Sequence, residues 1–226
     1  MTAGRWGIER HVGSAGSFHG RDLPQPARRV AWWFEVDGPT VVLGSTQAEE
    51  LVDQERAAAR GVSVVRRRSG GGAVWLDPAS VTWVDVVLPA GDPHWDDDVG
   101  RSAGWLGRVW VDALADLDVE GAAAYDGPML RTDDARLVCF AGLAPGEVVV
   151  GGAKVVGVSQ RRTRVGARFQ CAVLHAWDPV PLVEVLDLPA GERAALAERL
   201  APSGAGIGPV APATVVATFL RHLRTA

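Results

Sequence analysis

The chain has 226 residues, 47% of them hydrophobic, so it is long enough to build one large domain with a sizeable core. Its formal net charge of −4 at pH 7 gives no global attraction to nucleic acid or to an anionic membrane. Two cysteines make no disulfide framework, which favours a reducing, cytoplasmic setting. No apolar run approaches the ~18 residues of a membrane span.

The beginning of the chain predicts little regular structure. Residues 1–27 mix charge, glycine and serine, end near two prolines and lack the apolar segment of a secretory signal. We expect a loose leader there, and a single domain with C-terminal helices over residues 28–226. Strands are expected at 30–36 and 40–43. A capping-box pattern then predicts a helix over residues 46–60.

The middle of the chain alternates between short apolar runs and turn residues. A strand at 62–68 leads into a glycine-rich turn, and residues 73–76 and 81–88 are expected to pair as a hairpin. Three aspartates at 96–98 predict the start of a helix that runs to about residue 117, because negative charge suits a helix N-terminus.

The last part of the chain predicts strands first and helices afterwards. Residues 118–134 are expected to be mostly loop. The expected strands are 136–142, 147–150, 154–160 and 168–175, and the expected helices are 181–186, 191–200 and 212–223. Strands joined by short turns, with helices between and after them, favour an α+β fold with a mixed or antiparallel sheet and flanking helices over alternating βαβ units.

Residues 66–74 form the first pattern with chemical meaning, Arg-Arg-Arg-Ser-Gly-Gly-Gly-Ala-Val. Glycines expose backbone N–H groups that side chains cannot shield, and such a turn can follow a carboxyl-bearing or anionic ligand closely. No Gly-Lys-Ser/Thr closes the pattern, so it is not a P-loop. The alternative interpretation is a glycine-rich hairpin turn with solvated arginines.

Lys154 is the second candidate, because it lies in an apolar segment between Gly152 and Gly157. A lysine there either extends its ammonium to solvent or pairs with an anion. Beside the glycine turn it could complete a pocket for an activated acyl group.

Taken alone, Cys139 is expected to be an inert core residue, as most unpaired cysteines are. No His or Lys lies near it in the sequence to activate its thiol. The histidines show no metal-ligand spacing and there is no Cys-x-x-Cys pattern, so we predict no metal site.

These motifs together resemble the lipoate–protein ligase A family, within the larger group of biotin/lipoate ligases and octanoyltransferases. Residues 66–74 are similar, almost residue for residue, to the family's Arg-Arg-x-Ser-Gly-Gly-Gly-Ala-Val loop. Residues 39–47, 154–162 and 167–174 are similar to three further family segments in the same order. The resemblance covers about residues 28–180 and implies a mixed β-sheet with flanking helices, like the catalytic domain of biotin/lipoate ligases.

The resemblance also implies roles for particular residues. Residues 69–73 would line the acyl tunnel, and Lys154 would contact the carboxyl or acyl-phosphate oxygen. Cys139 falls where a branch of octanoyltransferases carries its acyl-accepting cysteine. We therefore name Lys154 and Cys139 as candidate catalytic residues. The candidate substrate-binding residues are Arg67, Ser69, Gly70, Gly71, Gly72, Ala73, Val74, Gly157 and Ser159.

Three functions follow from the resemblance, and the glycine loop favours the first. The first function is that of a ligase, which uses ATP with Mg²⁺ to activate lipoate or octanoate and attaches the acyl group to a lysine. The acceptor would be a lipoyl carrier domain of a 2-oxoacid dehydrogenase or the glycine cleavage H protein, with no nucleic acid or membrane partner. We expect Lys154→Ala to abolish activity and to leave the fold intact.

The second function is an octanoyltransferase that forms a thioester on Cys139 and needs no ATP or other cofactor. The third is an inactive module that binds lipoate or acyl-adenylate, because two positions where family members carry histidine are Leu76 and Cys171 here. The acyl chain length, the donor, the need for an accessory protein and the oligomeric state are left open.

Overall fold

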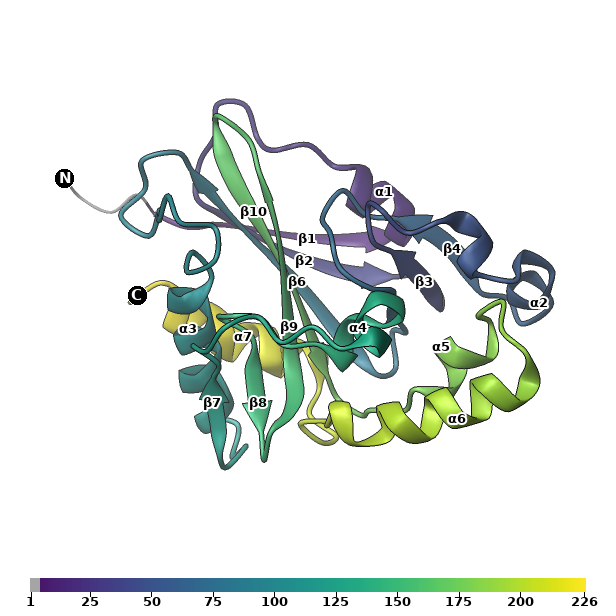
Figure 1. The fold of residues 1–226 in the computed structure, drawn as a ribbon. Helices are drawn as coiled ribbons and strands as arrows, with labels where there is room; N and C mark the ends of the chain where they lie inside the picture. The colour runs from purple at the N-terminus through teal and green to yellow at the C-terminus, as the bar shows by residue number, and fades with distance from the viewer. Residues whose placement is uncertain (1–4) are drawn as a thin grey trace.

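A computed structural model describes residues 5–226. Its centre is a seven-stranded sheet in the order β1-β2-β6-β10-β9-β8-β7 (Figure 1). These strands are β1 (Gly7–Gly13), β2 (Val30–Val36), β6 (Val81–Pro89), β7 (Ala122–Ala124), β8 (Val148–Val150), β9 (Ala153–Arg162) and β10 (Gly166–Leu174). Only the β1–β2 pair is parallel among the neighbours in this sheet, so the sheet is mixed, as predicted.

A second, three-stranded sheet has β3 (Thr40–Leu43) between β4 (Ser63–Arg66) and β5 (Val74–Leu76). Seven α-helices surround the two sheets within residues 5–226. They are α1 (Ala15–Gly20), α2 (Gln54–Ala59), α3 (Gly104–Ala115), α4 (Asp133–Leu137), α5 (Val180–Glu184), α6 (Ala190–Leu200) and α7 (Pro212–Leu223). None of them is long and apolar enough to cross a membrane.

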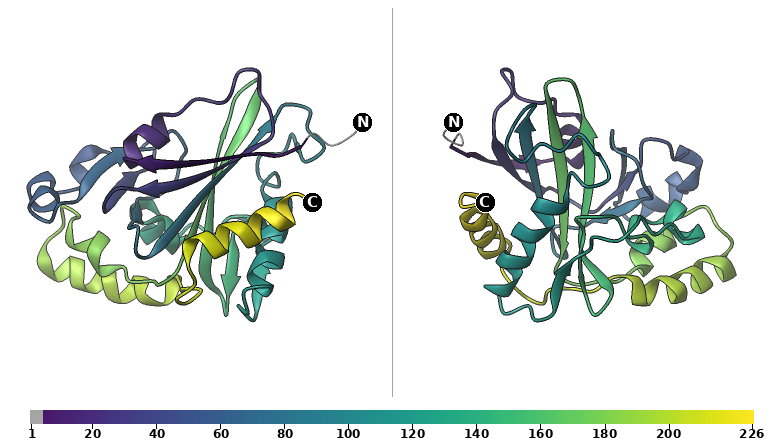
Figure 2. Two further views of the ribbon diagram at one scale, coloured as in Figure 1. Left: turned by 180° about the vertical axis from the view of Figure 1, so that it is seen from behind. Right: turned by 60° about the vertical axis from the view of Figure 1, so that its left-hand side comes forward.

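Different elements cover the two faces of the large sheet. Figure 2 shows α3 and α7 on one side of this sheet and the small sheet with α6 on the other. Trp110 of α3 and Phe219 of α7 stack with ring centroids 3.9 Å apart in the core beneath them. A separate apolar cluster joins the small sheet to α5 and α6, and a third lies between the two sheets. The last of these clusters adjoins the candidate site.

The predicted loose leader is wrong for residues 7–20. β1 pairs with β2 along its whole length, and α1 follows it. β1 is an edge strand without an apolar alternation, so its sequence carries no strand pattern. Side-chain bonds anchor it instead, because Glu9 accepts hydrogen bonds from Arg21 at 3.0 Å, Arg28 at 3.1 Å and Trp32 at 3.1 Å. Residues 1–4 lie outside the described part.

Two predicted β elements are also wrong. β5 and β6 do not form a hairpin, because β5 pairs with β3 in the small sheet and β6 pairs with β2 and β10 in the large one. Residues 136–142 are not a strand. They hold the end of α4 and a 3₁₀ turn over Cys139–Ala141. Thr132 caps α4 by accepting a hydrogen bond from the backbone N–H of Ala135 at 3.0 Å, which favours a helix over the apolar strand pattern that follows.

Two predicted helices begin later than expected. The first is divided into a 3₁₀ turn at Glu49–Leu51 and α2, and Asp53 caps α2 through the N–H of Arg56 at 2.9 Å. The second begins only at residue 104, because the aspartates before it form local turns. Asp96 accepts a hydrogen bond from the N–H of Asp98 at 2.8 Å, a bond that competes with helix formation. The predicted helices at the C-terminal end are confirmed to within two residues at most ends.

Candidate active site

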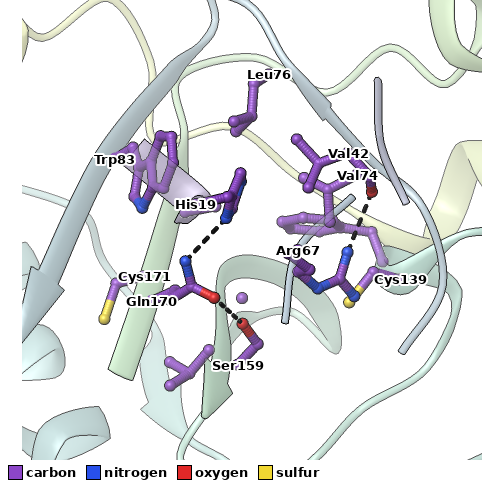
Figure 3. Close-up of a pocket in the computed structure, with 14 residues that line it drawn as sticks. His19, Val42, Arg67, Val74, Leu76, Trp83, Cys139, Ser159, Gln170 and Cys171 are labelled. Atoms are coloured by element: carbon purple, nitrogen blue, oxygen red, sulfur yellow. Dashed lines mark hydrogen bonds between the residues drawn. The ribbon is translucent and has the colours of Figure 1, made fainter. Parts of the chain in front are cut away.

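An apolar pocket lies between the large and the small sheet (Figure 3). Its empty space is about 440 Å³, a volume that includes open solvent at the mouth. Most of its wall is apolar, with Val42, Val74, Leu76, Trp83, Phe140 and Val158 among the lining residues. The polar groups that reach it are few: His19, Arg67, Cys139, Ser159 and Gln170. Such a pocket suits a hydrocarbon chain with one reactive end.

Arg67 fixes the shape of the glycine loop at one side of the pocket. Its guanidinium donates hydrogen bonds to the carbonyl oxygens of Val42 at 3.1 Å, Gly70 at 2.7 Å and Gly72 at 2.8 Å. The side chain is buried, and burial lowers its pKa while the nearby Cys139 acts in the opposite direction. Figure 3 shows the Arg67 guanidinium beside the Cys139 sulfur. Among residues 5–226, Arg67 is the only lysine or arginine that lines this pocket, and Cys139 is the one cysteine of its lining that is partly exposed.

The glycines let the loop pack directly on the turn that carries Cys139. A β-carbon added to Gly72 would lie 2.7 Å from the backbone nitrogen of Cys139. Gly71 has φ +100°, and a β-carbon there would lie 2.9 Å from Arg67 Nη2 and 3.7 Å from Cys139 Sγ. On the far side of the loop, Ala73 and the Cys139 turn exchange backbone hydrogen bonds, with Cys139 N–H donating to Ala73 O at 2.9 Å.

Gly72→Ala tests this close approach. We expect it to reduce stability by roughly 1–3 kcal/mol, the usual cost of overpacking, and to displace the Cys139 turn, so that turnover falls as well. Gly70→Ala is the matched control, because an added methyl there meets nothing within 4 Å. Denaturant unfolding and turnover of both variants check the prediction, and equal effects at the two positions would contradict it.

Lys154 does not line the pocket, and its ammonium already has partners. It forms an ion pair with Glu147 at 2.8 Å and donates a hydrogen bond to the carbonyl oxygen of Cys139 at 3.0 Å. Lys154 and Glu147 have only 2% and 3% of their side chains exposed. Glu147 also accepts hydrogen bonds from the N–H groups of Ala144 at 2.7 Å and Val158 at 3.1 Å. The pair therefore holds the backbone of Cys139 in place, a different contact from the predicted one with the acyl carboxyl.

A series of hydrogen-bonded polar side chains crosses the pocket floor from the glycine loop to α1. Ser69 Oγ lies 3.0 Å from Ser159 Oγ and donates to Gln170 Oε1 at 3.1 Å. Gln170 Nε2 lies 3.0 Å from His19 Nδ1 (Figure 3). Of the predicted binding residues, the structure therefore brings Arg67, Ser69, Val74, Gly157 and Ser159 to the pocket or its floor. Gly70, Gly71, Gly72 and Ala73 form the loop beside Cys139.

Among the pocket residues that sequence analysis missed, which include Gln170 and Trp83, His19 was missed because it lies in the predicted leader. Its ring stacks on Trp83 with centroids 4.4 Å apart. Burial, with the positive charges of Arg168 and Arg67, lowers the pKa of His19 to about 3. The ring is therefore neutral at pH 7. A serine that caps α1, Ser14, is the one local signal that could have indicated this helix.

This low pKa makes stability depend on pH. Between about pH 6.5 and 3 the unfolded chain binds a proton at His19 that the folded chain does not, so the free energy of unfolding falls as pH is lowered through this window. His19→Phe removes that contribution, and its stability curve should be flatter by up to about 1.4 kcal/mol per pH unit. Denaturant unfolding of both proteins across this window gives the slopes, and parallel curves would show that His19 titrates normally.

Comparison with known proteins identifies the family. The family model for the lipoyl protein ligase A/B catalytic domain matches residues 21–203. The chain belongs to this family. The resemblance of the glycine loop and the lysine segment is thereby confirmed.

Two curated relatives are octanoyltransferases LipM. The one from Kyrpidia tusciae is 33% identical over 175 residues, which cover 76% of this chain and 62% of the relative. The one from Carboxydothermus hydrogenoformans is 34% identical over 138 residues, covering 61% of this chain and 48% of the relative. The matches thus span about half to three-fifths of the length of these relatives.

Solved structures of ligases share the fold. Lipoate-protein ligase A bound with ATP superposes with a TM-score of 0.71 at 19% identity, over 98% of this chain and 84% of that one. The bi-partite lipoate protein ligase of Thermoplasma acidophilum gives 0.69 at 19% identity, over 97% of this chain and 83% of that one. They confirm the predicted α+β fold of the family.

Cys171 and Leu76 stand at the two positions where the family resemblance places histidine. Cys171 is fully buried, and burial raises the pKa of its thiol far above the ordinary value. Leu76 is an apolar part of the pocket wall. Both cysteines are among the lining residues of the pocket, but only the Cys139 side chain is partly exposed. The candidate nucleophile is therefore Cys139 rather than Cys171.

A second pocket, with Ala73, Val138 and Phe140 in its lining, has about 620 Å³ of empty space including open solvent. Asp77 and Asp178 line it, and no lysine or arginine of the described residues does. Lys154, predicted to contact the acyl carboxyl or acyl-phosphate oxygen, is instead paired with Glu147. Within residues 5–226, no three His, Cys, Asp or Glu side chains are grouped so that they could hold a metal ion.

Proposed function

We propose that the protein is a cysteine-dependent acyltransferase that moves an octanoyl-type chain from a thioester donor to a lysine of a lipoyl carrier domain without ATP. The observation that carries this proposal is the position of Cys139. Its thiol faces an apolar pocket, with the Arg67 guanidinium beside it and the glycine loop packed against its turn. The octanoyltransferase relatives support the same function.

In the first step the Cys139 sulfur attacks the carbonyl carbon of the donor thioester. A new carbon–sulfur bond forms, the carbonyl is restored, and the donor's sulfur leaves as a thiol with the proton lost by Cys139. The positive charge of Arg67 stabilises the negative charge that develops on the carbonyl oxygen. The Nε–H of Arg67 is buried and has no hydrogen-bond partner among the described residues.

In the second step the uncharged amine of the acceptor lysine attacks the Cys139 thioester. An amide bond forms, the carbon–sulfur bond breaks, and the proton of the amine returns to the sulfur. Covalent catalysis divides one transfer into two easier steps, while the pocket keeps the chain in place between them. Lys154 acts as a positioning residue, because its ammonium holds the Cys139 carbonyl oxygen rather than the substrate.

An ATP-dependent ligase is the function that the glycine loop alone favours. The Lys154–Glu147 pair argues against it, because the lysine predicted to contact the activated acyl group already has an anionic partner and does not line the pocket. The acceptor is proposed to be a lipoyl carrier domain, as in the structure of the T. acidophilum ligase described with its E2 lipoyl domain. The family membership and the apolar pocket support an acyl chain as the group transferred.

A transfer assay with two donors tests the proposal. The protein is mixed with an apo lipoyl domain and either octanoyl carrier protein without ATP, or octanoate with ATP and Mg²⁺. We expect the mass of the lipoyl domain to increase by one octanoyl group in the first mixture only. Modification only in the second mixture would establish the ligase, and modification in neither would leave a binding module.

A further inference from the structure

We infer that two exposed arginines beside the acyl pocket, Arg68 and Arg161, form an anion-binding site for the phosphate of the phosphopantetheine arm on which a carrier presents its acyl thioester. These two residues are called the arginine pair below. The inference rests on the proposed acyl transfer and deepens it, because it names the group by which the donor is recognised. Cys139 is partly exposed, so an acyl chain in the pocket leaves the arm of its donor outside.

The arginine pair adjoins the pocket floor without lining the pocket. Arg68 directly precedes Ser69 in the glycine loop. Arg161 follows Ser159 by two positions in β9, so the two side chains leave the strand on the same face. The hydroxyl oxygens of Ser69 and Ser159 lie 3.0 Å apart. This contact brings the two arginines to the same edge of the pocket.

The guanidinium groups of the pair meet at one carboxylate. Arg68 donates a hydrogen bond to Oδ1 of Asp22 at 2.6 Å, and Nη1 of Arg161 lies 3.9 Å from the same oxygen. Burial lowers the pKa of Arg161 and the positive charge of Arg68 lowers it further, whereas Asp22 acts in the opposite direction. Two like charges held this close favour an anion between them.

Asp22 is an exchangeable partner for the arginine pair. Its side chain is 77% exposed, and those of Arg68 and Arg161 are 43% and 33% exposed, so a ligand can reach all three. Exposed ion pairs contribute little to stability, and displacing the carboxylate therefore costs little. Guanidinium groups bind phosphate oxygens through paired, charge-assisted hydrogen bonds, which makes a phosphate a suitable replacement.

The surface around the arginine pair is positive although the whole chain has a formal net charge of −4. Arg21 and Arg28 both donate hydrogen bonds to Glu9, and Arg21 is adjacent to Asp22 in the chain. With the arginine pair, this patch has more arginines than carboxylates. Such a local excess of positive charge raises the rate at which an anionic donor meets the site.

The length of the donor's arm suits this position. The arm that joins the thioester sulfur to its phosphate is about as long as an extended peptide of four or five residues, roughly 15 Å. Arg67, whose guanidinium lies beside the Cys139 sulfur, is followed directly by Arg68. The path from the nucleophile to the arginine pair is therefore no longer than two arginine side chains and the peptide unit between them, a length that such an arm spans.

The test compares the rates at which three donors acylate Cys139, read by intact mass of the full-length protein. The donors are octanoyl-pantetheine, which has no phosphate, octanoyl-phosphopantetheine and octanoyl carrier protein. We expect the phosphate to raise the second-order rate constant about tenfold, because hydrogen bonds between charged groups are the stronger ones. Inorganic phosphate should compete with octanoyl-phosphopantetheine and leave the reaction of octanoyl-pantetheine unaffected.

Substitutions at the site should act in opposite directions. The double variant Arg68→Gln, Arg161→Gln removes both positive charges, so the advantage given by the phosphate should disappear. Asp22→Asn removes the competing carboxylate, so the advantage should exceed that of the wild-type protein. Arg221→Gln is the matched control, because this exposed arginine of α7 is paired with Asp116 outside the pocket. The ratio of two donors within one variant does not depend on how much of the protein is folded.

The possible results separate this inference from the proposed function. If octanoyl-pantetheine and octanoyl-phosphopantetheine acylate the wild-type protein equally fast, the inference is overturned and the acyl transfer stands. If the double arginine variant loses rate with carrier protein alone, the pair binds the protein surface of the carrier, which also overturns the phosphate assignment. Acylation by none of the three donors would remove both proposals.

Discussion

Replacing Cys139 with alanine is expected to abolish transfer of the octanoyl group to the carrier domain. Without the sulfur no thioester can form, and loss of a nucleophile of this kind lowers turnover on the order of 10⁴-fold or more. Cys139→Ser keeps the shape of the side chain but offers a weaker nucleophile, so its turnover should fall almost as far. Both variants should remain folded, because Cys139 is only partly buried. Turnover with a circular dichroism control is the measurement.

Cys171→Ala is the matched control for these variants. This thiol is fully buried in the core beneath α3 and is expected to have no part in the chemistry, so the variant should retain acyl transfer. A Cys139→Ala protein with near-normal turnover would show that the cysteine is not the nucleophile. In that case an ATP-dependent reaction would have to be reconsidered.

Lys154→Met is expected to reduce both stability and turnover. Removing one partner of a buried ion pair leaves the other charge uncompensated, which typically costs about 3–5 kcal/mol. Glu147 would be left in that state, since both side chains are almost fully buried. Turnover should fall because the carbonyl oxygen of Cys139 loses its charged donor and keeps only the N–H of Gly142 at 3.3 Å. The expectation that the fold survives loss of Lys154 unchanged is thus revised by the burial of the pair.

The double variant Glu147→Gln, Lys154→Met separates the two effects. It removes both charges, so much of the lost stability should return. The Cys139 carbonyl oxygen still lacks the Lys154 ammonium, so turnover should stay low. The loss should appear in kcat more than in KM. Denaturant unfolding and steady-state kinetics provide the two readouts. Full recovery of turnover in the double variant would show that Lys154 has no role in positioning Cys139.

The glycine loop and the partner of Lys154 were predictable, because both depend on short contiguous patterns. Residues 66–74 and the lysine segment together indicated the family, and the apolar setting of Lys154 predicted that it would pair with an anion or reach solvent. The structure supplies that anion as Glu147, seven residues earlier in the chain. The predicted strand at 154–160 is confirmed as β9, which runs from Ala153 to Arg162. In these segments the local sequence was enough to predict the strand and the pairing of the lysine.

The contribution of α1 could not be predicted, because tertiary contacts hold it. Its six residues include two glycines, and no apolar periodicity distinguishes them. Arg168, almost 150 residues away in sequence, anchors the helix through the carbonyl oxygen of Phe18. The turn at Cys139 was misread for a related reason. Its apolar run resembles a strand, but the close approach of Gly72 places the run against the glycine loop instead.

Intact mass of the wild-type protein after mixing with octanoyl carrier protein, in the absence of ATP, tests the central claim most directly. The account predicts a mass gain of one octanoyl group, located on Cys139 by peptide mapping and lost when an apo lipoyl domain is added. An unmodified protein that nonetheless octanoylates the lipoyl domain, or a group attached to any residue other than Cys139, would contradict it.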